Sequence, residues 1–190
     1  MASLHFIYSA MNAGKSTDLI QAAYNYNERK MEVLILKASI DTRDGDSVVK
    51  SRIGLEMGCV MFNTDENLFD LVKNHFNGVA CVFVDEAQFM TKEQVDQLTD
   101  VVDLLDIPVM AYGLRTDSNG DAFPGSARLL AVADKLPEKK TICHCGKKAD
   151  MVLRLSDTGE VIKGGDQIQI GGNDRYVSVC RKHWKAGAID

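Results

Sequence analysis

The sequence predicts an α/β fold in which a parallel β-sheet is flanked by helices, followed by a small β-rich domain at the C-terminus. Three observations lead to this prediction. Short apolar runs suited to buried strands alternate with helical segments over the first 138 residues. Phosphate-site motifs directly follow two of these runs, at the sheet edge where ligands bind. From residue 139 onward, close pairs of cysteine and histidine are separated by glycine-rich, β-prone sequence.

The first apolar run, Leu4–Tyr8, leads into a tight turn with Gly-Lys-Ser and then into a helical segment that ends near Lys30. This is the context of a phosphate-binding P-loop, in which backbone N–H groups and the helix dipole hold phosphate oxygens. Lys15 is expected to reach the β- and γ-phosphates, and the Ser16 hydroxyl to bind Mg²⁺. The motif is degenerate, because Ser9 stands where the usual pattern has glycine. The predicted phosphate-binding residues of the loop are Ser9, Ala10, Met11, Asn12, Ala13, Gly14, Lys15 and Ser16.

The composition limits the classes of partner and compartment. The 190 residues, 45% of them hydrophobic, suffice for one ordinary domain and a small second one. A net charge of −5 and a pI near 5.4 argue against a nucleic acid as the main partner. The chain has no excess of basic residues that could replace the counterions of a phosphate backbone. No window is apolar enough to cross a membrane, and we expect no secretory signal. Five cysteines, an odd number, favour a reducing cytoplasm over a disulfide scaffold.

The second apolar run, Val33–Leu36, is short and uninterrupted, as in a strand buried on both faces of a parallel sheet. The polar stretch that follows, residues 41–52, is predicted to be a loop. Arg43 and Arg52 lie in this loop, near the carboxyl end of the strand, where cations can reach phosphates. Two exposed arginines are the alternative interpretation.

The third apolar run, Ala80–Val84, leads directly into the acidic pair Asp85 and Glu86. In a P-loop protein, an aspartate at the tip of a neighbouring strand completes the Mg²⁺ shell opposite the P-loop serine, here Ser16. Glu86 is expected to serve as a general base. An acidic pair after a strand is a common loop start, but together with the P-loop it indicates a nucleotide-phosphate site. The phosphate-site residues predicted outside the P-loop are Asp85, Glu86, Ala87, Gln88 and Arg43.

The remaining elements of this part continue the alternation. They are a helix capped by Asp65, a helix opened by the capping box Thr91–Gln94, a strand over Ile107–Leu114, and a helix that ends at Ala133.

Two close ligand pairs, Cys143 with Cys145 and Cys180 with His183, occur in the last fifty residues. Four soft ligands in two pairs suit a tetrahedral, structural Zn²⁺, which a small domain with little core needs. Cys-x-Cys is a less usual pair than Cys-x-x-Cys, and His144 is a competing ligand. The alternative interpretation is free thiols and a surface histidine.

Five stretches of the chain carry a family resemblance. They are Ser9–Thr17 (SAMNAGKST), Ile40–Arg43 (IDTR), Val84–Phe89 (VDEAQF), Tyr112–Asp117 (YGLRTD) and Ile170–Cys180 (IGGNDRYVSVC). With them the chain resembles type II thymidine kinases over nearly its full length. The resemblance implies a P-loop domain over residues 1–138 and a zinc-binding lasso domain over residues 139–190 that covers the nucleoside site.

The activity that the resemblance implies is transfer of the γ-phosphate of ATP to the 5′-hydroxyl of thymidine, giving dTMP for DNA precursor salvage. Deoxyuridine is expected to be accepted as well. Glu86 then takes the proton of the 5′-hydroxyl, Asp85 and Ser16 are the Mg²⁺ partners, and Arg43 is a phosphate-side cation with Asp41 nearby. The implied cofactors are Mg²⁺ and a structural Zn²⁺.

The resemblance also implies a nucleoside pocket in which a flat base lies between apolar side chains while backbone groups satisfy its edge. For some of these side chains, ordinary core packing is the alternative interpretation. Relatives often carry an aromatic residue where this chain has Ser118. Family members are typically homotetramers inhibited by dTTP. The implied thymidine-binding residues are Met11, Phe89, Leu114, Phe123, Ile170, Gly171 and Tyr176.

Two other functions remain open at this point. One is a P-loop ATPase whose zinc module binds a nucleic acid or a partner protein, against which the acidic pI counts. The other is a kinase of the same fold that acts on another nucleoside, because a pocket discriminates a single methyl by only about 1–3 kcal/mol.

Overall fold

The computed structural model describes residues 1–41, 47–75, 78–165, 167 and 175–190. Its larger part holds β1 (Leu4–Ser9), α1 (Lys15–Glu28), β2 (Glu32–Ala38), β3 (Val48–Lys50), β4 (Glu56–Gly58), β5 (Val60–Phe62), α2 (Leu68–Asn74), β6 (Val79–Asp85), the 3-10 helix η1 (Ala87–Phe89), α3 (Lys92–Leu105), β7 (Val109–Leu114) and α4 (Pro124–Val132). Its C-terminal part holds β8 (Thr141–Ile142), β9 (Lys148–Ala149), β10 (Met151–Leu155), β11 (Val161–Ile162), β12 (Tyr176–Val179) and α5 (Arg181–Ala186).

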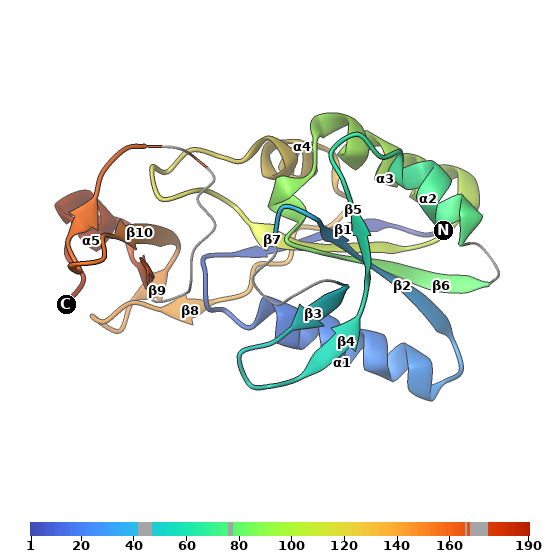
Figure 1. The fold of residues 1–190 in the computed structure, drawn as a ribbon, viewed down its shortest axis with the longest axis horizontal. Coiled ribbons are helices and arrows are strands. Elements are labelled where there is room, and N and C mark those ends of the chain that lie inside the picture. The colour runs from blue at the N-terminus through green and yellow to red at the C-terminus, as the bar shows by residue number, and fades with distance from the viewer. Residues whose placement is uncertain (42–46, 76–77, 166, 168–174) are drawn as a thin grey trace.

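The predicted α/β fold with a central parallel sheet is confirmed. The sheet has the order β1-β7-β6-β2-β5, and all of its strand pairs are parallel. Helices α2, α3 and α4 cover one face, while α1 and the β3–β4 hairpin lie on the other (Figure 1). Each face has its own apolar core, and the middle strands are buried on both sides, so they read as uninterrupted apolar runs in the sequence.

The register of the sheet brings the two predicted phosphate motifs to one edge. Ser9 at the end of β1 pairs with Leu114 at the end of β7, and Lys37 near the end of β2 pairs with Asp85 at the end of β6. Because parallel strands end at the same edge, the residues that follow β1, β6 and β7 lie close together.

Some local predictions are confirmed and others are wrong. Thr91 caps α3 in a complete capping box with Gln94. The cap of α2 is Asn67 instead of the predicted Asp65, because residues 63–66 form a turn in which the Asn63 N–H bonds the Glu66 carboxylate. The loop predicted over residues 41–52 contains strand β3, which is too short to show a pattern.

The C-terminal part, with α5 and β10, lies at the left of Figure 1. It is built around a three-stranded antiparallel sheet, β11-β10-β12, with a small core of its own. The segment that leads to it runs beside β1 and extends the edge of the large sheet: Phe6 N–H bonds Lys135 C=O at 2.9 Å, and Lys139 N–H bonds Tyr8 C=O at 2.9 Å. Among the described residues, no helix is both long and apolar enough to span a membrane.

Candidate active site and metal centre

The P-loop joins β1 to α1 in a conformation suited to anion binding. Asn12 and Gly14 adopt left-handed backbone conformations, with φ of 65° and 74°. Gly14 precedes α1 without a side-chain cap, which leaves the first N–H groups of the helix to a ligand. The buried Lys15 ammonium donates to the Ser9 hydroxyl at 3.0 Å and to the Ala10 carbonyl at 3.1 Å.

Ser9 therefore has a definite role at the position where the usual motif has glycine. Its hydroxyl accepts a hydrogen bond from Lys15 and donates one to the Ala10 carbonyl at 2.6 Å. The departure from the motif thus supplies an oxygen that orients Lys15, the lysine predicted to bind phosphate. The motif alone does not reveal this role.

Ser16 and Asp85 meet as the sequence predicts for a magnesium site. The Ser16 hydroxyl donates to the two carboxylate oxygens of Asp85 at 3.3 and 3.5 Å. Burial, and next the charge of Glu86, raises the pKa of Asp85 to about 7, against opposing effects of Lys15 and Lys37. A hydroxyl and a carboxylate are hard oxygen ligands of the kind Mg²⁺ takes, so the pair fits a divalent cation.

A pH-dependent stability follows from this buried carboxyl group. Because its pKa is raised on folding, the folded chain holds the proton more tightly, and stability falls as the pH rises from the ordinary aspartate value towards 7. In metal-free protein, the parent chain is therefore expected to lose about 2 kcal/mol of its free energy of unfolding between pH 5 and pH 7 through this group. Asp85→Asn lacks the carboxyl group and is expected not to show this loss. Urea unfolding of both proteins at these two pH values measures this, and parallel stability curves would contradict the assignment.

Glu86 lies directly after β6 and is held by a neighbouring glutamine. Its backbone is left-handed, with φ of 50°, a costly conformation that is frequent at functional sites. The Gln88 amide N–H donates to the Glu86 carboxylate, and the Gln88 carbonyl oxygen accepts from the Leu114 N–H at 3.0 Å. Gln88, only 2% exposed, thus links the proposed base to the end of β7. Sequence reasoning placed Gln88 beside the phosphates and missed this role.

The backbone of α4 packs closely on the turn that follows Glu86. A Cβ on Gly125, in the first turn of α4, would lie 2.6 Å from the Met90 carbonyl oxygen and 2.9 Å from that of Ala87. Only glycine lets α4 reach η1 this closely. Sequence reasoning did not single out Gly125.

A buried ion pair lies beside Asp85. Lys37, which is fully buried, has its ammonium 3.3 Å from the buried Asp41 carboxylate and donates to the Val48 carbonyl. The lysine directly follows the apolar run Val33–Leu36 and lies within the same buried strand, a signal that sequence reasoning passed over. Arg43, the predicted phosphate-side cation, lies outside the described residues.

The predicted nucleoside residues come from several elements. Phe89 follows β6 and Phe123 precedes α4, and their rings meet edge to face with centroids 6.0 Å apart. Met11 is in the P-loop, and Leu114 ends β7. Ile170 and Gly171 lie outside the described residues.

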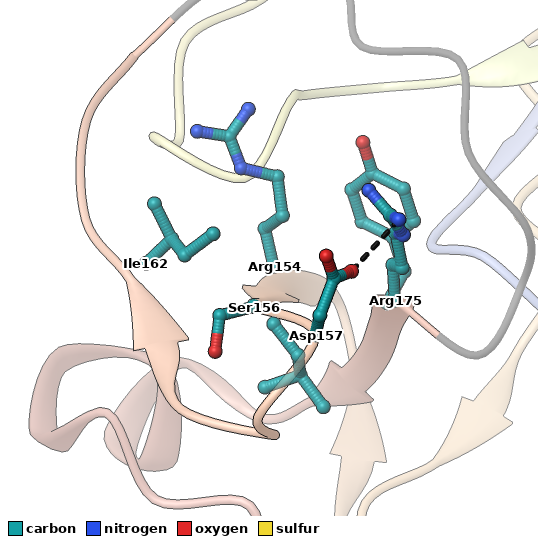
Figure 2. A pocket seen from close by; sticks show the side chains of 7 residues that line it. Arg154, Ser156, Asp157, Ile162 and Arg175 are labelled. Atoms are coloured by element: carbon teal, nitrogen blue, oxygen red, sulfur yellow. Dashed lines mark ion pairs between the residues drawn. The ribbon is translucent and has the colours of Figure 1, made fainter.

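Tyr176 begins β12 in the C-terminal part. It lines a cavity of about 220 Å³ together with Arg154 and the ion pair of Arg175 and Asp157 (Figure 2). Within the described residues this cavity is formed by the C-terminal part alone.

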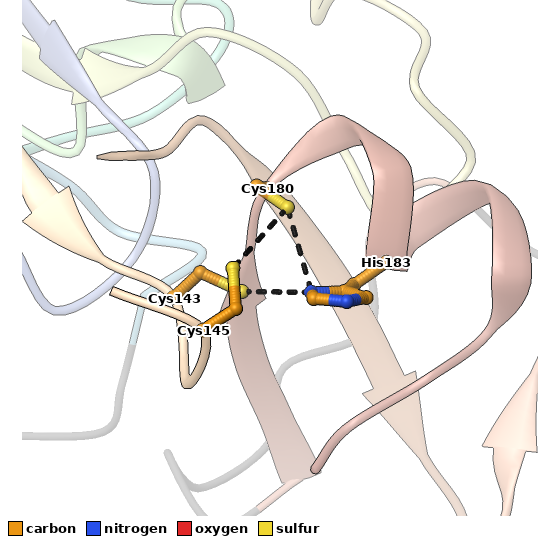
Figure 3. Close-up of side chains that lie close together, drawn as sticks. All are labelled: Cys143, Cys145, Cys180 and His183. Atoms are coloured by element: carbon orange, nitrogen blue, oxygen red, sulfur yellow. Dashed lines mark hydrogen bonds between the residues drawn. The ribbon is translucent and has the colours of Figure 1, made fainter. Parts of the chain in front are cut away.

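The predicted metal ligands converge. The ligand atoms of Cys143, Cys145, Cys180 and His183 all lie within 4.8 Å of one another (Figure 3). Nδ1 of His183 is 3.2 Å from the Cys143 sulfur and 3.5 Å from that of Cys180, and the sulfurs of Cys145 and Cys180 are 3.9 Å apart. Zn–S bonds of about 2.3 Å and a Zn–N bond of about 2.0–2.1 Å place tetrahedral ligands at separations of this size. The cluster therefore fits a structural Zn²⁺.

Local chemistry also favours metal binding here. Burial alone raises the pKa of the Cys143 thiol, but hydrogen bonds from the backbone of Cys145 and Cys180 and from His183 bring the pKa down to about 6. The thiolate, which is the metal-binding form, then predominates at neutral pH. His144 is not in the cluster; its ring packs on that of His183, with centroids 4.2 Å apart.

Helix α5, which the sequence analysis did not predict, positions two of these ligands. Cys180 precedes its first turn and His183 lies three residues on, so both face the same side. Trp184, the next residue, donates its indole N–H to the Ser118 carbonyl at 2.9 Å. The metal cluster is thereby tied to the loop that follows β7.

The comparisons with known proteins agree with this architecture. The family model described as thymidine kinase matches residues 2–184. The thymidine kinase of Rhodopirellula baltica is 62% identical over 187 residues, covering 97% of this chain and 89% of that protein. That of Mannheimia succiniciproducens is 59% identical over 187 residues, covering 97% and 96%. On its motifs, its fold and these relatives, the chain belongs to the thymidine kinase family.

Proposed function

We propose that this chain transfers the γ-phosphate of ATP to the 5′-hydroxyl of thymidine, with Mg²⁺ and a structural Zn²⁺. The observation that carries the proposal is the meeting of Lys15, Ser16, Asp85 and Glu86 at one sheet edge in a member of the thymidine kinase family. Phosphoryl transfer demands little covalent chemistry from a protein, so positioning and charge compensation account for most of the catalysis.

Each of these residues has one role in the proposed reaction. Lys15 and the N–H groups at the start of α1 bind the β- and γ-phosphates, while Ser16 and Asp85 hold Mg²⁺, which compensates the negative charge of the phosphates. Glu86 accepts the proton of the 5′-hydroxyl as the hydroxyl oxygen attacks the γ-phosphorus, and the bond from the γ-phosphorus to the bridging oxygen breaks to release ADP. Gln88 holds the Glu86 carboxylate in place.

We further propose that residues 1–138 and 139–190 act as two domains, the second being a lasso domain that covers the nucleoside. Hydrogen bonds from Ser178 to the Met11 carbonyl and from Trp184 to the Ser118 carbonyl support this arrangement, because they join the lasso domain to the P-loop and to the loop that follows β7. In this proposal the base lies near Phe89 and Phe123, which offer apolar ring faces, and Tyr176 closes the pocket.

The test compares thymidine with 5′-deoxythymidine, which has the same base and lacks the attacking hydroxyl. Incubation of thymidine with the protein, ATP and Mg²⁺ is expected to give dTMP and ADP in equal amounts, read by mass spectrometry. With 5′-deoxythymidine, ADP is expected to stay at the level seen without nucleoside. ADP release that is the same with and without thymidine would instead favour the ATPase alternative.

The family resemblance alone supports three further proposals: a homotetramer, inhibition by dTTP and a cytoplasmic location. Light scattering during size-exclusion chromatography tests the first. A rise in the apparent KM for thymidine on addition of dTTP tests the second.

A further inference from the structure

Strand β12 turns one face to its own domain and the other to the P-loop. Successive residues of a strand point to opposite faces. Val177 and Val179 pack in the apolar core that contains Cys143 and Cys180. Ser178 points the other way, and its hydroxyl donates to the Met11 carbonyl at 2.7 Å across 167 residues of sequence. The face of β12 that carries Ser178 and Tyr176 is therefore the one that meets the large domain.

The peptide that accepts this hydrogen bond lies at the centre of the P-loop. The preceding carbonyl, that of Ala10, accepts from the Lys15 ammonium at 3.1 Å. The following residue, Asn12, has a φ of 65°, and such a left-handed conformation persists only where surrounding contacts hold it. The Met11 carbonyl thus lies between Ala10, whose carbonyl binds Lys15, and the left-handed Asn12. A hydrogen bond to the Met11 carbonyl therefore helps to set the direction in which the N–H groups of the loop point.

We propose that Ser178 is a positioning residue, whose hydroxyl holds the Met11 peptide of the P-loop in its phosphate-binding conformation when the lasso domain is in place. The inference rests on the proposed function and adds a coupling to it. The family resemblance implies that Met11, a P-loop residue, also contacts the nucleoside, and Tyr176 shares the β12 face with Ser178. A nucleoside that contacts both Met11 and Tyr176 is therefore expected to strengthen the hydrogen bond from Ser178 to Met11, and by linkage nucleoside and nucleotide each strengthen the binding of the other equally.

The experiment measures the affinity for Mg·ADP by calorimetry, with and without saturating thymidine. In the parent chain, thymidine is expected to tighten Mg·ADP binding. Ser178→Ala is expected to weaken Mg·ADP binding with thymidine present by about threefold to tenfold, the size of one net hydrogen bond, and to remove most of the effect of thymidine. Ser178→Thr keeps a hydroxyl and is expected to retain both properties.

Ser156→Ala is the matched control, because it removes a hydroxyl of the lasso domain that bonds Thr158 and Glu160 in its own turn. It is expected to behave as the parent chain does. Zinc content and melting temperature are measured for each variant. Should Ser178→Ala lose zinc, Ser178→Cys replaces it, since a thiol is a weak donor of similar size, and a weaker Mg·ADP affinity is again expected.

The inference would be overturned if zinc-loaded Ser178→Ala bound Mg·ADP as the parent chain does and thymidine tightened this binding equally in both. It would also be overturned if thymidine had no effect on the Mg·ADP affinity of the parent chain. The proposed function fails separately, by absence of dTMP formation in the parent chain.

Discussion

Glu86→Gln is expected to bind ATP and thymidine as the parent chain does while lowering kcat by about a hundredfold or more. Glutamine keeps the length of the side chain and an oxygen that can accept the hydrogen bond from Gln88, so the geometry after β6 is retained. It cannot take the proton of the 5′-hydroxyl, and a positioned base contributes about 10²–10⁴-fold. Initial rates of dTMP formation, with ADP affinity measured in parallel, test this.

Glu93→Gln is the matched control, because Glu93 is an exposed carboxylate in the first turn of α3, a few residues further along the chain. It is expected to leave kcat unchanged. A Glu86→Gln enzyme that turns over within a few-fold of the parent rate would show that another group, or water, accepts the proton.

Cys180→Ser is expected to bring the zinc content from about one ion per chain to nearly none and to abolish most dTMP formation. Two of the four ligand residues, Cys143 and Cys180, belong to the small C-terminal core, so metal binding there is expected to contribute to the folding energy. The P-loop does not use this cysteine, so weak ATP binding is expected to persist. Metal analysis and the thymidine assay on the purified variant measure both effects.

The fluorescence of Trp184 is expected to report the loss of the metal directly. Trp184 is the single tryptophan of the chain, and its ring packs so closely on Gly120 that a Cβ there would lie 2.9 Å away. Loss of the metal is expected to expose the indole and shift its emission to the red. Cys59→Ser, at a half-buried thiol far from the cluster in sequence, is the control and is expected to keep zinc and emission. A zinc-free, fully active Cys180→Ser protein would contradict a structural metal.

The parts of the fold that the sequence predicts well are those with a strong local cause. The middle strands are buried on both faces and so read as apolar runs, and the Thr91–Gln94 capping box marks the start of α3 unambiguously. The meeting of Ser16 with Asp85 and the convergence of the Cys/His cluster were predictable for another reason. Each depends on residue types at fixed spacing, and the parallel topology brings Ser16 and Asp85 together.

The parts that were missed depend on contacts between distant segments. Asn67 caps α2 because a turn at residues 63–66 delays the helix, and nothing in the local pattern favours it over Asp65. The roles of Gln88 and Ser178 arise from partners on other elements, the Leu114 N–H and the Met11 carbonyl. Such hydrogen bonds leave no periodic signal in the sequence.

Thymidine is the nucleoside that this chain is proposed to phosphorylate. The most direct test is the ratio of kcat/KM for thymidine, deoxyuridine, uridine, deoxycytidine and deoxyadenosine with ATP and Mg²⁺, scored as 5′-monophosphate. Thymidine is expected to rank first, with deoxyuridine next and lower by about tenfold or somewhat more, the discrimination that one methyl group allows. A higher kcat/KM for another nucleoside, or no monophosphate from any of them, would contradict the account.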